Sequence, residues 1–420
     1  MKKMRVISAA VLGCISSMAM AQSTLGNSSV TLYGLVDLGF SHVTGGVGGT
    51  QNAITSGNME GSRFGFKGSE DLGGGYRAIF TMESRLEADT GSLSNRPASL
   101  GTLPSRLSTA TSLGLPSAYQ TAVTGVAAQI GATLGVNLNN SVFDRQIFTG
   151  LVTPFGAFTL GRQYTPAYLA NANFDAMKTE SSLSIGQLVS IPASFDIRVS
   201  NSLQYGLQKD GISATAMYAA GEVAGKASAN RLLGVMGMYQ GSGYGFGAGY
   251  NTRNNEVGDK SLTTAIVGAS VDVGPGTLSG EFVTIKDDHP TGLASIASGL
   301  VASGVSSTVA TQIQSAFYNG LKQDAHLFQV GYRVTTGPHT VTVAYNHMND
   351  RTAFNADRYS YGAAYTYALS KRTDLNAVAT HLVNKNTSQL ALGGAGYLGG
   401  VTSAAGVDSN SVVFSIRHRF

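Results

Sequence analysis

The chain has 420 residues, of which 12% are charged and 43% are hydrophobic, so an intrinsically disordered protein is excluded. Beyond the N-terminus no apolar run approaches the roughly 20 residues of a membrane-spanning helix, which disfavours a helical membrane protein. Glycine is abundant, with 54 residues, proline is scarce, with 9, and Tyr and Phe contribute 18 and 17 residues. This composition favours one large all-β domain whose strands pack side by side through small residues.

The first 21 residues are predicted to be a secretory signal peptide, which leaves residues 22–420 as the mature domain. Basic residues at 2, 3 and 5 precede a short apolar core at 6–12, and Ala19-Met20-Ala21 forms a small-x-small cleavage site. The alternative is a lipoprotein box at 11–14 that ends in Cys14. The cleavage site is the better formed of the two, so the sequence predicts an exported protein.

The charge and cysteine content of the mature domain exclude several kinds of site. Loss of the signal removes three of 28 basic residues, and the remaining 25 stand against 24 acidic ones, a balance of +1. Such a balance gives no support to a nucleic-acid partner. Cys14 is the only cysteine, so the mature domain is expected to have no disulfide, thiolate metal site or cysteine nucleophile.

An alternation of period two begins at residues 29–41, where one parity is apolar and the other is mixed. Residues 62–68 and 76–83 repeat it, with Arg63 and Lys67 standing opposite aromatic residues. Placing basic residues of a strand face in a dry core costs much free energy, whereas placing them in water costs little. The face that carries them is therefore expected to line a wet channel.

The same alternation predicts sixteen strands. After the first three, they cover 141–152, 157–164, 198–208, 212–220, 230–240, 243–252, 261–272, 277–286, 323–335, 339–349, 357–369, 373–384 and 409–420. Short connections rich in Gly, Pro, Asp or Ser alternate with long ones at about 42–57, 87–140, 165–197, 287–322 and 385–408. This pattern predicts a 16-stranded antiparallel transmembrane β-barrel, with short periplasmic turns and long extracellular loops.

The third long connection, at about 165–197, has few charges and no clean period, and we expect it to fold inward and narrow the pore. Basic side chains near the flanking strands would oppose its acidic ones and bias which ions pass. The alternative is that the basic residues are merely solvated in the lumen. The residues concerned are Arg63, Lys67, Arg77, Arg162 and Arg198 on the basic side and Asp175, Glu180 and Asp196 on the acidic side.

Two insertions, at 105–138 and 292–320, are rich in Ala, Ser and Leu and depart from the strand pattern. They are predicted to form short helices in the second and sixth long loops. Mobile surface loops are one interpretation, because loops vary most. A cap over the pore mouth and a contact with a neighbouring subunit are the others.

Sequence signatures of catalysis and of nucleotide or metal binding are missing from the chain. The glycine series at 241–249 has no strand-then-helix context, and no Walker, HExxH or GxSxG sequence occurs. The seven histidines show no ligand spacing. His381 and His418 lie on predicted strands, but a barrel hydrolase needs a grouped nucleophile and base. No catalytic, cofactor-binding or metal-binding residue is predicted.

Several stretches together resemble a known family. They are SSVTLYGLVDLGF, SRFGFKGSEDLGGGYRAIFTMES, FGAFTLGRQYTP, ALSKRTDLN and the closing SIRHRF. They resemble the general-diffusion porins of Gram-negative β-proteobacteria, of the Burkholderia and Bordetella type. The resemblance implies a 16-stranded homotrimer in the outer membrane, passive diffusion of ions and small hydrophilic solutes, and no cofactor. Outer-membrane lipid or lipopolysaccharide and the barrel-assembly machinery are the further partners it implies, the latter through a C-terminal signal ending in Phe420.

The resemblance also carries pore residues onto this chain. The arginine of the SRxGFKG strand falls on Arg63, and the arginine after the third loop falls on Arg198. A further arginine of anion-selecting relatives is replaced here by Asp144, which weakens the expected preference for anions. The acidic residue of the third loop falls on Asp175, but the Pro-Phe-Gly that usually follows is missing.

Together these observations predict a water-filled outer-membrane porin with weak ion selectivity. A solute-specific channel is one alternative, and Tyr33 and Tyr164 are the aromatic residues that could guide a solute. A plugged barrel that acts as an adhesin or a structural protein is another, because the two Ala-rich insertions could close the lumen.

Overall fold

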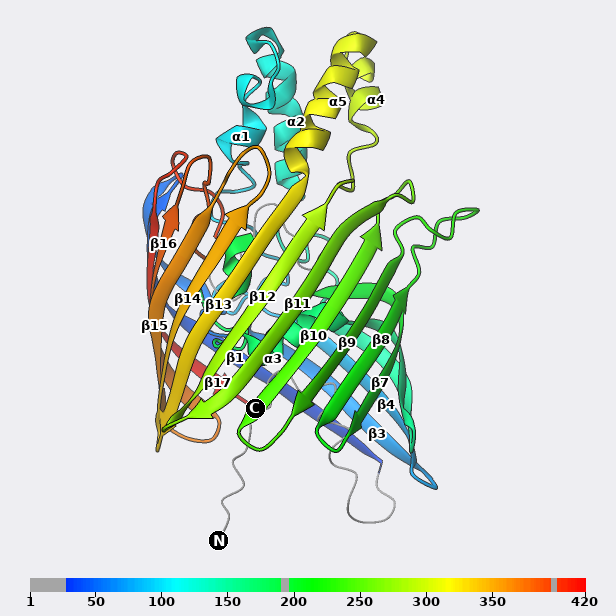
Figure 1. The fold of residues 1–420 in the computed structure, drawn as a ribbon, viewed down its shortest axis with the longest axis vertical. Coiled ribbons are helices and arrows are strands. Elements are labelled where there is room, and N and C mark those ends of the chain that lie inside the picture. Colours follow the sequence, from blue (N-terminus) through cyan, green and yellow to red (C-terminus); the bar gives the residue numbers. More distant parts are fainter. Residues whose placement is uncertain (1–27, 190–195, 394–398) are drawn as a thin grey trace.

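The computed structural model describes residues 28–189, 196–393 and 399–420, so the predicted signal peptide lies outside the described residues. Figure 1 shows a β-barrel with a helical protrusion above one side of it. The strands are β1 (Ser29–Gly46), β2 (Gly49–Ser56), β3 (Arg63–Gly73), β4 (Tyr76–Arg85), β5 (Gln146–Thr153), β6 (Gly156–Tyr164), β7 (Arg198–Lys209), β8 (Ile212–Ala219), β9 (Leu232–Gln240), β10 (Tyr244–Asn254), β11 (Lys260–Val273), β12 (Gly276–Asp287), β13 (Gln323–Thr336), β14 (His339–Asp350), β15 (Arg358–Ala368), β16 (Thr373–Asn384) and β17 (Ser409–Arg419).

Helices occur only in the long connections of the described chain. They are α1 (Ser105–Ser108), η1 (Thr111–Leu113), η2 (Ser117–Tyr119), α2 (Gln120–Ala132), α3 (Pro166–Phe174), η3 (Ile185–Val189), α4 (Ile296–Ala302) and α5 (Ser307–Leu321). None of these helices is long and apolar enough to cross a membrane.

The barrel closes through β1 and β17, which pair antiparallel from Leu35↔Arg419 to Thr44↔Asn410. On its other side, β1 pairs with β3 along its first half and with β2 along its second half. Strands β2 and β3 therefore share one position in the wall, and the chain leaves the wall between them at residues 57–62. The predicted fold of sixteen antiparallel wall strands is confirmed.

The prediction of a long loop at 42–57 was wrong, because β1 continues to Gly46 and β2 follows after a tight turn. On the outward face of this hairpin, the ring of His42 hydrogen-bonds the side chain of Asn52 at 2.7 Å. The alternation of apolar and polar residues is therefore lost in the hairpin of β1 and β2, where both faces carry polar residues. A period-two pattern of hydrophobicity cannot reveal such a strand.

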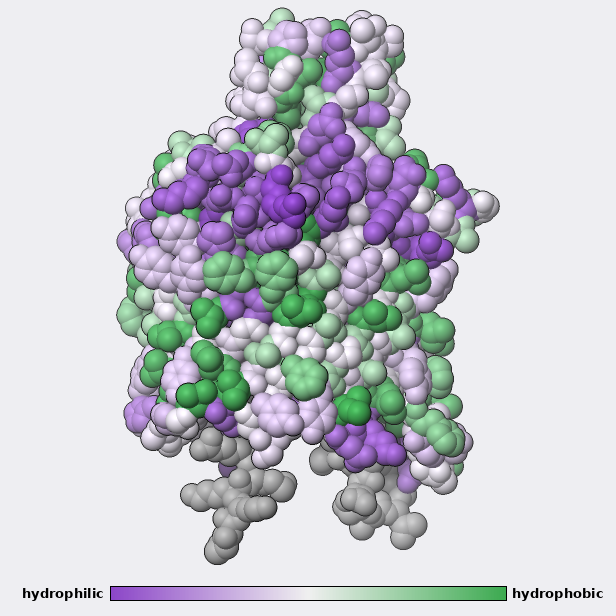
Figure 2. Space-filling view, in the orientation of Figure 1, coloured by the Kyte–Doolittle hydropathy of each residue, from purple (hydrophilic) through white to green (hydrophobic). Residues whose placement is uncertain are grey.

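The outward face of the wall is apolar. Residues such as Phe246, Val267 and Val343 are about half exposed, at 55%, 54% and 46%, although they sit in the middle of strands. Figure 2 shows apolar residues around the lower and middle barrel and hydrophilic residues gathered above them, toward the long loops. Exposed apolar side chains in such a band fit hydrocarbon rather than water.

Much of the core is built by the third long loop, whose described residues 165–189 pack against the inner side of the wall. Helix α3 begins after Thr165, whose hydroxyl accepts from the amide of Tyr168, and Pro166 occupies its first turn. Phe174 and Leu188 of this loop are fully buried against inward residues of the wall, among them Ile266 and Leu327. The loop thus fills one side of the lumen.

Small residues on the wall let α3 lie directly against it. A Cβ added to Gly249 would lie 2.8 Å from the Cβ of Ala170, and one added to Gly268 would lie 2.5 Å from the Cβ of Phe174. Both distances are shorter than non-bonded carbon atoms tolerate. Gly249, from the glycine series at 241–249, thus faces the lumen.

Gly268→Val should therefore push α3 off the wall. Overpacking of this kind costs about 1–3 kcal/mol, so amide hydrogen exchange in α3 should become about 5- to 150-fold faster. Gly237→Val is the matched control, because a Cβ there meets nothing within 4 Å. Equal exchange rates of α3 in the two variants would contradict this account of the packing.

The helical protrusion in Figure 1 consists of the two Ala-rich insertions. Helices α1 and α2 belong to the second long loop, and α4 and α5 belong to the sixth. They share a hydrophobic core in which Leu107, Val123, Ile313 and Phe317 are fully buried. The prediction of short helices is confirmed, and the two insertions pack on each other rather than lying as separate loops.

Candidate functional site

The candidate site lies where the third loop meets a polar part of the wall. The loop covers the inner faces of β9–β16, where its Met177 and Leu183 pack with Ala344 and Val378 of the wall. The inner faces of β1 and β3–β7 lie opposite. Charged side chains from β3, β4, β7, β16 and β17, from the residues just before β3 and β5, and from the third loop converge there, and we call this set the wall network. Its members are Glu60, Arg63, Glu83, Arg145, Glu180, Arg198, Asp374, Arg417 and Arg419.

One half of the wall network is centred on Glu83 of β4. Its carboxylate accepts from Arg145 at 2.7 Å, lies 3.5 Å from the guanidinium of Arg63, and accepts from the hydroxyl of Tyr33 at 3.2 Å. Arg63 points inward because it lies on the face of β3 opposite to the outward Phe66, and Glu83 shares that face because it is the cross-strand partner of Gly65. Two guanidinium groups thus share one carboxylate.

The other half is centred on Arg417 of β17. Its guanidinium contacts Glu180 at 2.9 Å, Glu60 at 3.1 Å and Asp374 at 3.1 Å. Arg419 reaches the same Asp374 at 2.8 Å. Glu180 belongs to the third loop and Asp374 to β16, so Arg417 fastens the loop to the wall where the barrel closes.

Glu60 joins the two halves, because its carboxylate also pairs with Arg63. It lies in the segment 57–62, which leaves the wall between β2 and β3. The carboxylate of Asp37 holds this segment in place by accepting from the amides of Met59 and Glu60, at 2.7 and 2.8 Å. Burial alone would raise the pKa of Glu60, but the surrounding arginines outweigh burial and lower the pKa to about 2. Glu60 is therefore ionised at neutral pH.

Arg198 extends the network toward the third loop through Tyr164. The hydroxyl of Tyr164 accepts from Arg198 at 2.7 Å and from Arg145 at 3.2 Å, and the guanidinium of Arg198 lies 4.4 Å from the ring centre. The ring of Tyr164 also stacks on Tyr168 of α3, with centres 5.1 Å apart. Two basic residues and the start of the loop thus meet at one aromatic ring.

The acidic residues of the third loop do not face Arg63 and Arg198 across the gap, and this correction concerns all three. Glu180 pairs with Arg417, and Asp196 pairs with Arg253 of β10 at 2.7 Å. Asp175 is fully buried inside the loop. Glu180 and Asp196 are thus paired with other arginines, and Asp175 is held by hydrogen-bond donors within the loop and from β13.

Asp175 has a structural role in the loop. Its carboxylate accepts from the amides of Met177 and Thr179, both at 2.9 Å, from Ser184 at 2.6 Å, and from Gln329 of β13 at 2.8 Å. Burial raises the pKa of Asp175, and these hydrogen bonds oppose the rise. The residue closes a tight turn in place of the missing Pro-Phe-Gly and ties it to the wall.

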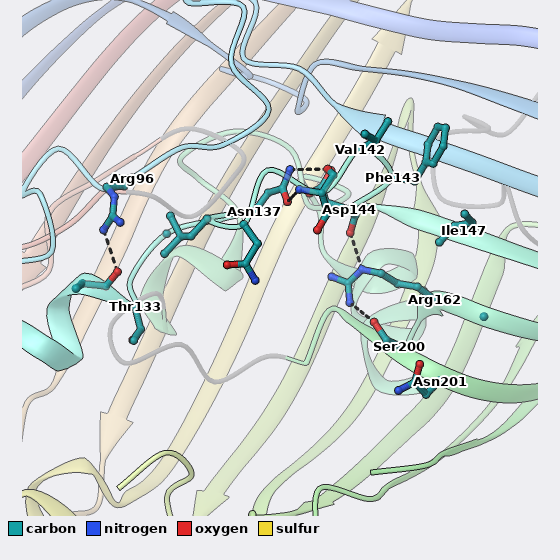
Figure 3. A pocket seen from close by; sticks show the side chains of 16 residues that line it. Arg96, Thr133, Asn137, Val142, Phe143, Asp144, Ile147, Arg162, Ser200 and Asn201 are labelled. Carbon is teal, nitrogen blue, oxygen red and sulfur yellow. Dashed lines mark hydrogen bonds between the residues drawn. The ribbon is translucent and has the colours of Figure 1, made fainter. Parts of the chain in front are cut away.

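Two predicted constriction residues are not members of the wall network: Arg162 lies on the outer face of the wall, and the carboxylate of Asp144 pairs with Arg85 at the base of the second loop. Arg162 is the cross-strand partner of Ile147, which is 42% exposed on the apolar outward face. Figure 3 shows both in an outer pocket of about 1100 Å³, where Arg162 donates to the backbone oxygen of Asp144 at 2.6 Å and to Ser200 at 3.1 Å. The side chain of Asp144 accepts from Arg85.

Lys67 and Arg77 face inward as predicted and lie nearer to the short turn between β3 and β4 than the wall network does. Lys67 lies over the ring of Tyr33, at 5.4 Å from its centre. Arg77 is paired in register with Asp71 beside the short turn between β3 and β4. It is six residues from Glu83 along β4, which corresponds to about 20 Å.

Sequence reasoning missed six members of the network, which are Glu60, Glu83, Arg145, Asp374, Arg417 and Arg419. One signal was available for the last two, because they alternate with apolar and aromatic residues in the closing SIRHRF. Glu60 lay in a segment assigned to the edge of a loop, and nothing local marks it as an inward residue. Its partners Arg417 and Arg419 are more than 350 positions away.

Comparison with known proteins agrees with this architecture. A model of the Gram-negative porin family matches residues 8–387. The chain is 26% identical to outer membrane porin protein 32 of Delftia acidovorans across the full length of both. It is 32% identical to an outer membrane porin protein of Bordetella pertussis over 103 residues, which cover 21% of this chain and 26% of that one.

A solved structure, an anion-selective porin from Comamonas acidovorans, shares the fold with a TM-score of 0.68 at 23% identity. The similarity covers 94% of this chain and 100% of that one. The family match spans most of the sequence, and the closed barrel with its apolar outer face agrees with it. The chain is therefore a member of the Gram-negative porin family, outer-membrane barrels through which small solutes diffuse passively.

Proposed function

We propose that this porin is a water-filled channel with weak ion selectivity, and that the wall network sets its field. The observation that carries the proposal is the near balance of the network. Arg63, Arg145, Arg198, Arg417 and Arg419 stand against Glu60, Glu83, Glu180 and Asp374. Five positive and four negative groups on one side of a confined lumen leave a small positive excess.

The excess favours a slight preference for anions. Arg198 contributes most to it, since among the described residues its contacts are with an aromatic ring and hydroxyl and not with a carboxylate. The porin from Comamonas acidovorans is described as anion-selective. Because Glu60, Glu83 and Asp374 offset most of the basic charge here, the preference of this channel should be weaker than a purely basic constriction would give.

We also propose that three copies assemble in the outer membrane, contacting lipopolysaccharide on their free surfaces. The outer pocket of Figure 3 supports a subunit contact, because its apolar lining includes the exposed Val142 and Ile147 beside the polar Arg162. The C-terminal Phe420 supports recognition by the barrel-assembly machinery. It seals the barrel through backbone hydrogen bonds with Gly34 at 3.1 and 3.2 Å, while its ring stays 45% exposed.

Recording from the purified protein in a planar lipid bilayer tests the proposal. We expect ohmic conductance that appears in groups of three steps, with a reversal potential in a salt gradient close to zero and slightly on the anion side. A protein that inserts without conductance would favour a plugged barrel. Strong selectivity for either ion would refute the balanced network.

A solute-specific channel is the second candidate, and one observation favours it. Tyr164 and Tyr168 present a stacked aromatic pair beside the wall network, and such surfaces bind the apolar faces of sugars. Block of the ion current by a sugar at low concentration would support this candidate. Unchanged current over a series of mono- and disaccharides would leave general diffusion as the function.

A further inference from the structure

The second long loop, residues 86–145, crosses the mouth of its own barrel. It leaves the wall at β4 and returns at β5, whereas the sixth long loop connects β12 and β13. Around the closed sheet, β5–β12 separate β4 from β13 in one direction and β14–β17 with β1–β3 separate them in the other. The two loops therefore start on opposite sides of the barrel, and their shared helical core requires one to span the opening.

Contacts on the far side place the crossing in the second loop. The amide of Ser105 donates to the side chain of Gln389 at 2.6 Å, in the loop between β16 and β17. Arg106 donates to the backbone oxygen of Gly320 at 3.1 Å and lies 5.0 Å from the ring centre of Phe354. The second loop is thus fastened to three other loops, and Figure 1 shows α1 and α2 standing beside α5 above β13.

The crossing segment is almost free of charge. Between Arg96 and Asp144 the only Asp, Glu, Lys or Arg is Arg106, and residues 290–321 of its partner loop contain none. Arg106 is itself occupied by Gly320 and Phe354. A segment with so few charges discriminates only weakly between cations and anions. Its packed helices can nevertheless obstruct large solutes by their size.

We infer that the crossing segment is an outer size filter, in series with the charged constriction below it. Solutes arriving from the loop side pass around the span before they reach the wall network, whereas solutes arriving from the turn side do not. The inference rests on the proposed function, because a filter needs an open channel beneath it. It adds a specificity element that limits how large a neutral solute can enter the lumen from the loop side.

The chain offers a clean way to remove the span. Asn95 and Val136 pair as an antiparallel bridge, with backbone hydrogen bonds of 2.9 and 3.1 Å, so the two ends of the span already lie together. Deletion of residues 97–134 would join Arg96 to Gly135 as the two central residues of a hairpin turn, a position that suits glycine. The base of the loop and all members of the wall network remain.

Neutral polyethylene glycols of increasing chain length, added to one side of a bilayer holding the channel, report which sizes enter. In the deletion variant, glycols too long to lower the conductance of the unaltered channel from the loop side should now lower it. The size limit from the turn side and the reversal potential should not change. An unchanged limit on the loop side would overturn the inference.

A point variant tests the same inference without shortening the loop, in case the deletion variant misfolds. Leu107→Asp places a carboxylate in the fully buried shared core and should shift the loop-side limit in the same direction. Leu100→Asp is its control, because Leu100 is 81% exposed on the same loop. If the unaltered protein does not conduct, the proposed function itself fails; if it conducts with equal limits in all variants, only the filter fails.

Discussion

A channel carrying Arg63→Ala together with Arg198→Ala should become clearly cation-selective. The double substitution turns the network's small positive excess into a negative one. In water, a unit charge about 8 Å from a passing monovalent ion changes its energy by about 0.5 kcal/mol, with opposite sign for cations and anions. Each lost arginine should thus change the permeability ratio about fivefold, and both together about 30-fold.

The fold should tolerate this change. Without Arg63, Glu60 keeps Arg417 and Glu83 keeps Arg145, so each carboxylate retains a cation. The measurement is the reversal potential in a potassium chloride gradient at low ionic strength, where screening is weakest.

The matched control is Arg77→Ala together with Arg162→Ala. It removes the same charge from residues at the turn end and on the outer face. If the control pair shifts the reversal potential as far as the test pair, the wall network does not set the field.

Replacement of Glu60 by glutamine should act in the opposite sense and make the channel markedly anion-selective. The side chain keeps its size, but Arg63, Arg417 and Arg419 lose a shared carboxylate. By the same arithmetic the anion-to-cation permeability ratio should rise about fivefold. The segment 57–62 should stay in place, because Asp37 holds it through backbone amides.

Glu87→Gln is the control for this second prediction. Glu87 is also buried and also ion-paired, with Arg85 at 3.0 Å, but it belongs to the base of the second loop rather than to the network. The two variants would be compared by reversal potential under one set of salt concentrations. If the reversal potential of Glu60→Gln is unchanged, or if Glu87→Gln shifts it equally, Glu60 does not set the ion selectivity.

The fold was largely predictable from the sequence because a barrel wall with an apolar outside repeats every second residue. The same rule explains the main failure, since β2 carries polar residues such as Asn52 on its outward face. The period-two pattern also predicts the orientation of Arg162 correctly, although this was not used in the sequence analysis. This arginine shares parity with Phe158 and Leu160, which are exposed on the outer surface, so its outward orientation followed from the pattern.

The site was less predictable, because its partners come from distant parts of the chain. Arg63 and Arg198 were identified from their strands and from the family resemblance, and both lie in the wall network. The partners of the loop acids were not visible, since the Glu180–Arg417 pair spans 237 positions. Only the closure of the sheet, which brings β17 beside β1, places these groups together.

The break in the wall between β2 and β3 has a consequence for ion selectivity. Residues 57–62 contribute no strand pairing of their own, yet they deliver Glu60 to the middle of the charged cluster. A change in the charge of the segment 57–62 would leave the backbone hydrogen bonds between the barrel strands intact. Ionic preference is thus set by a segment that lies outside the strand pairing that closes the barrel.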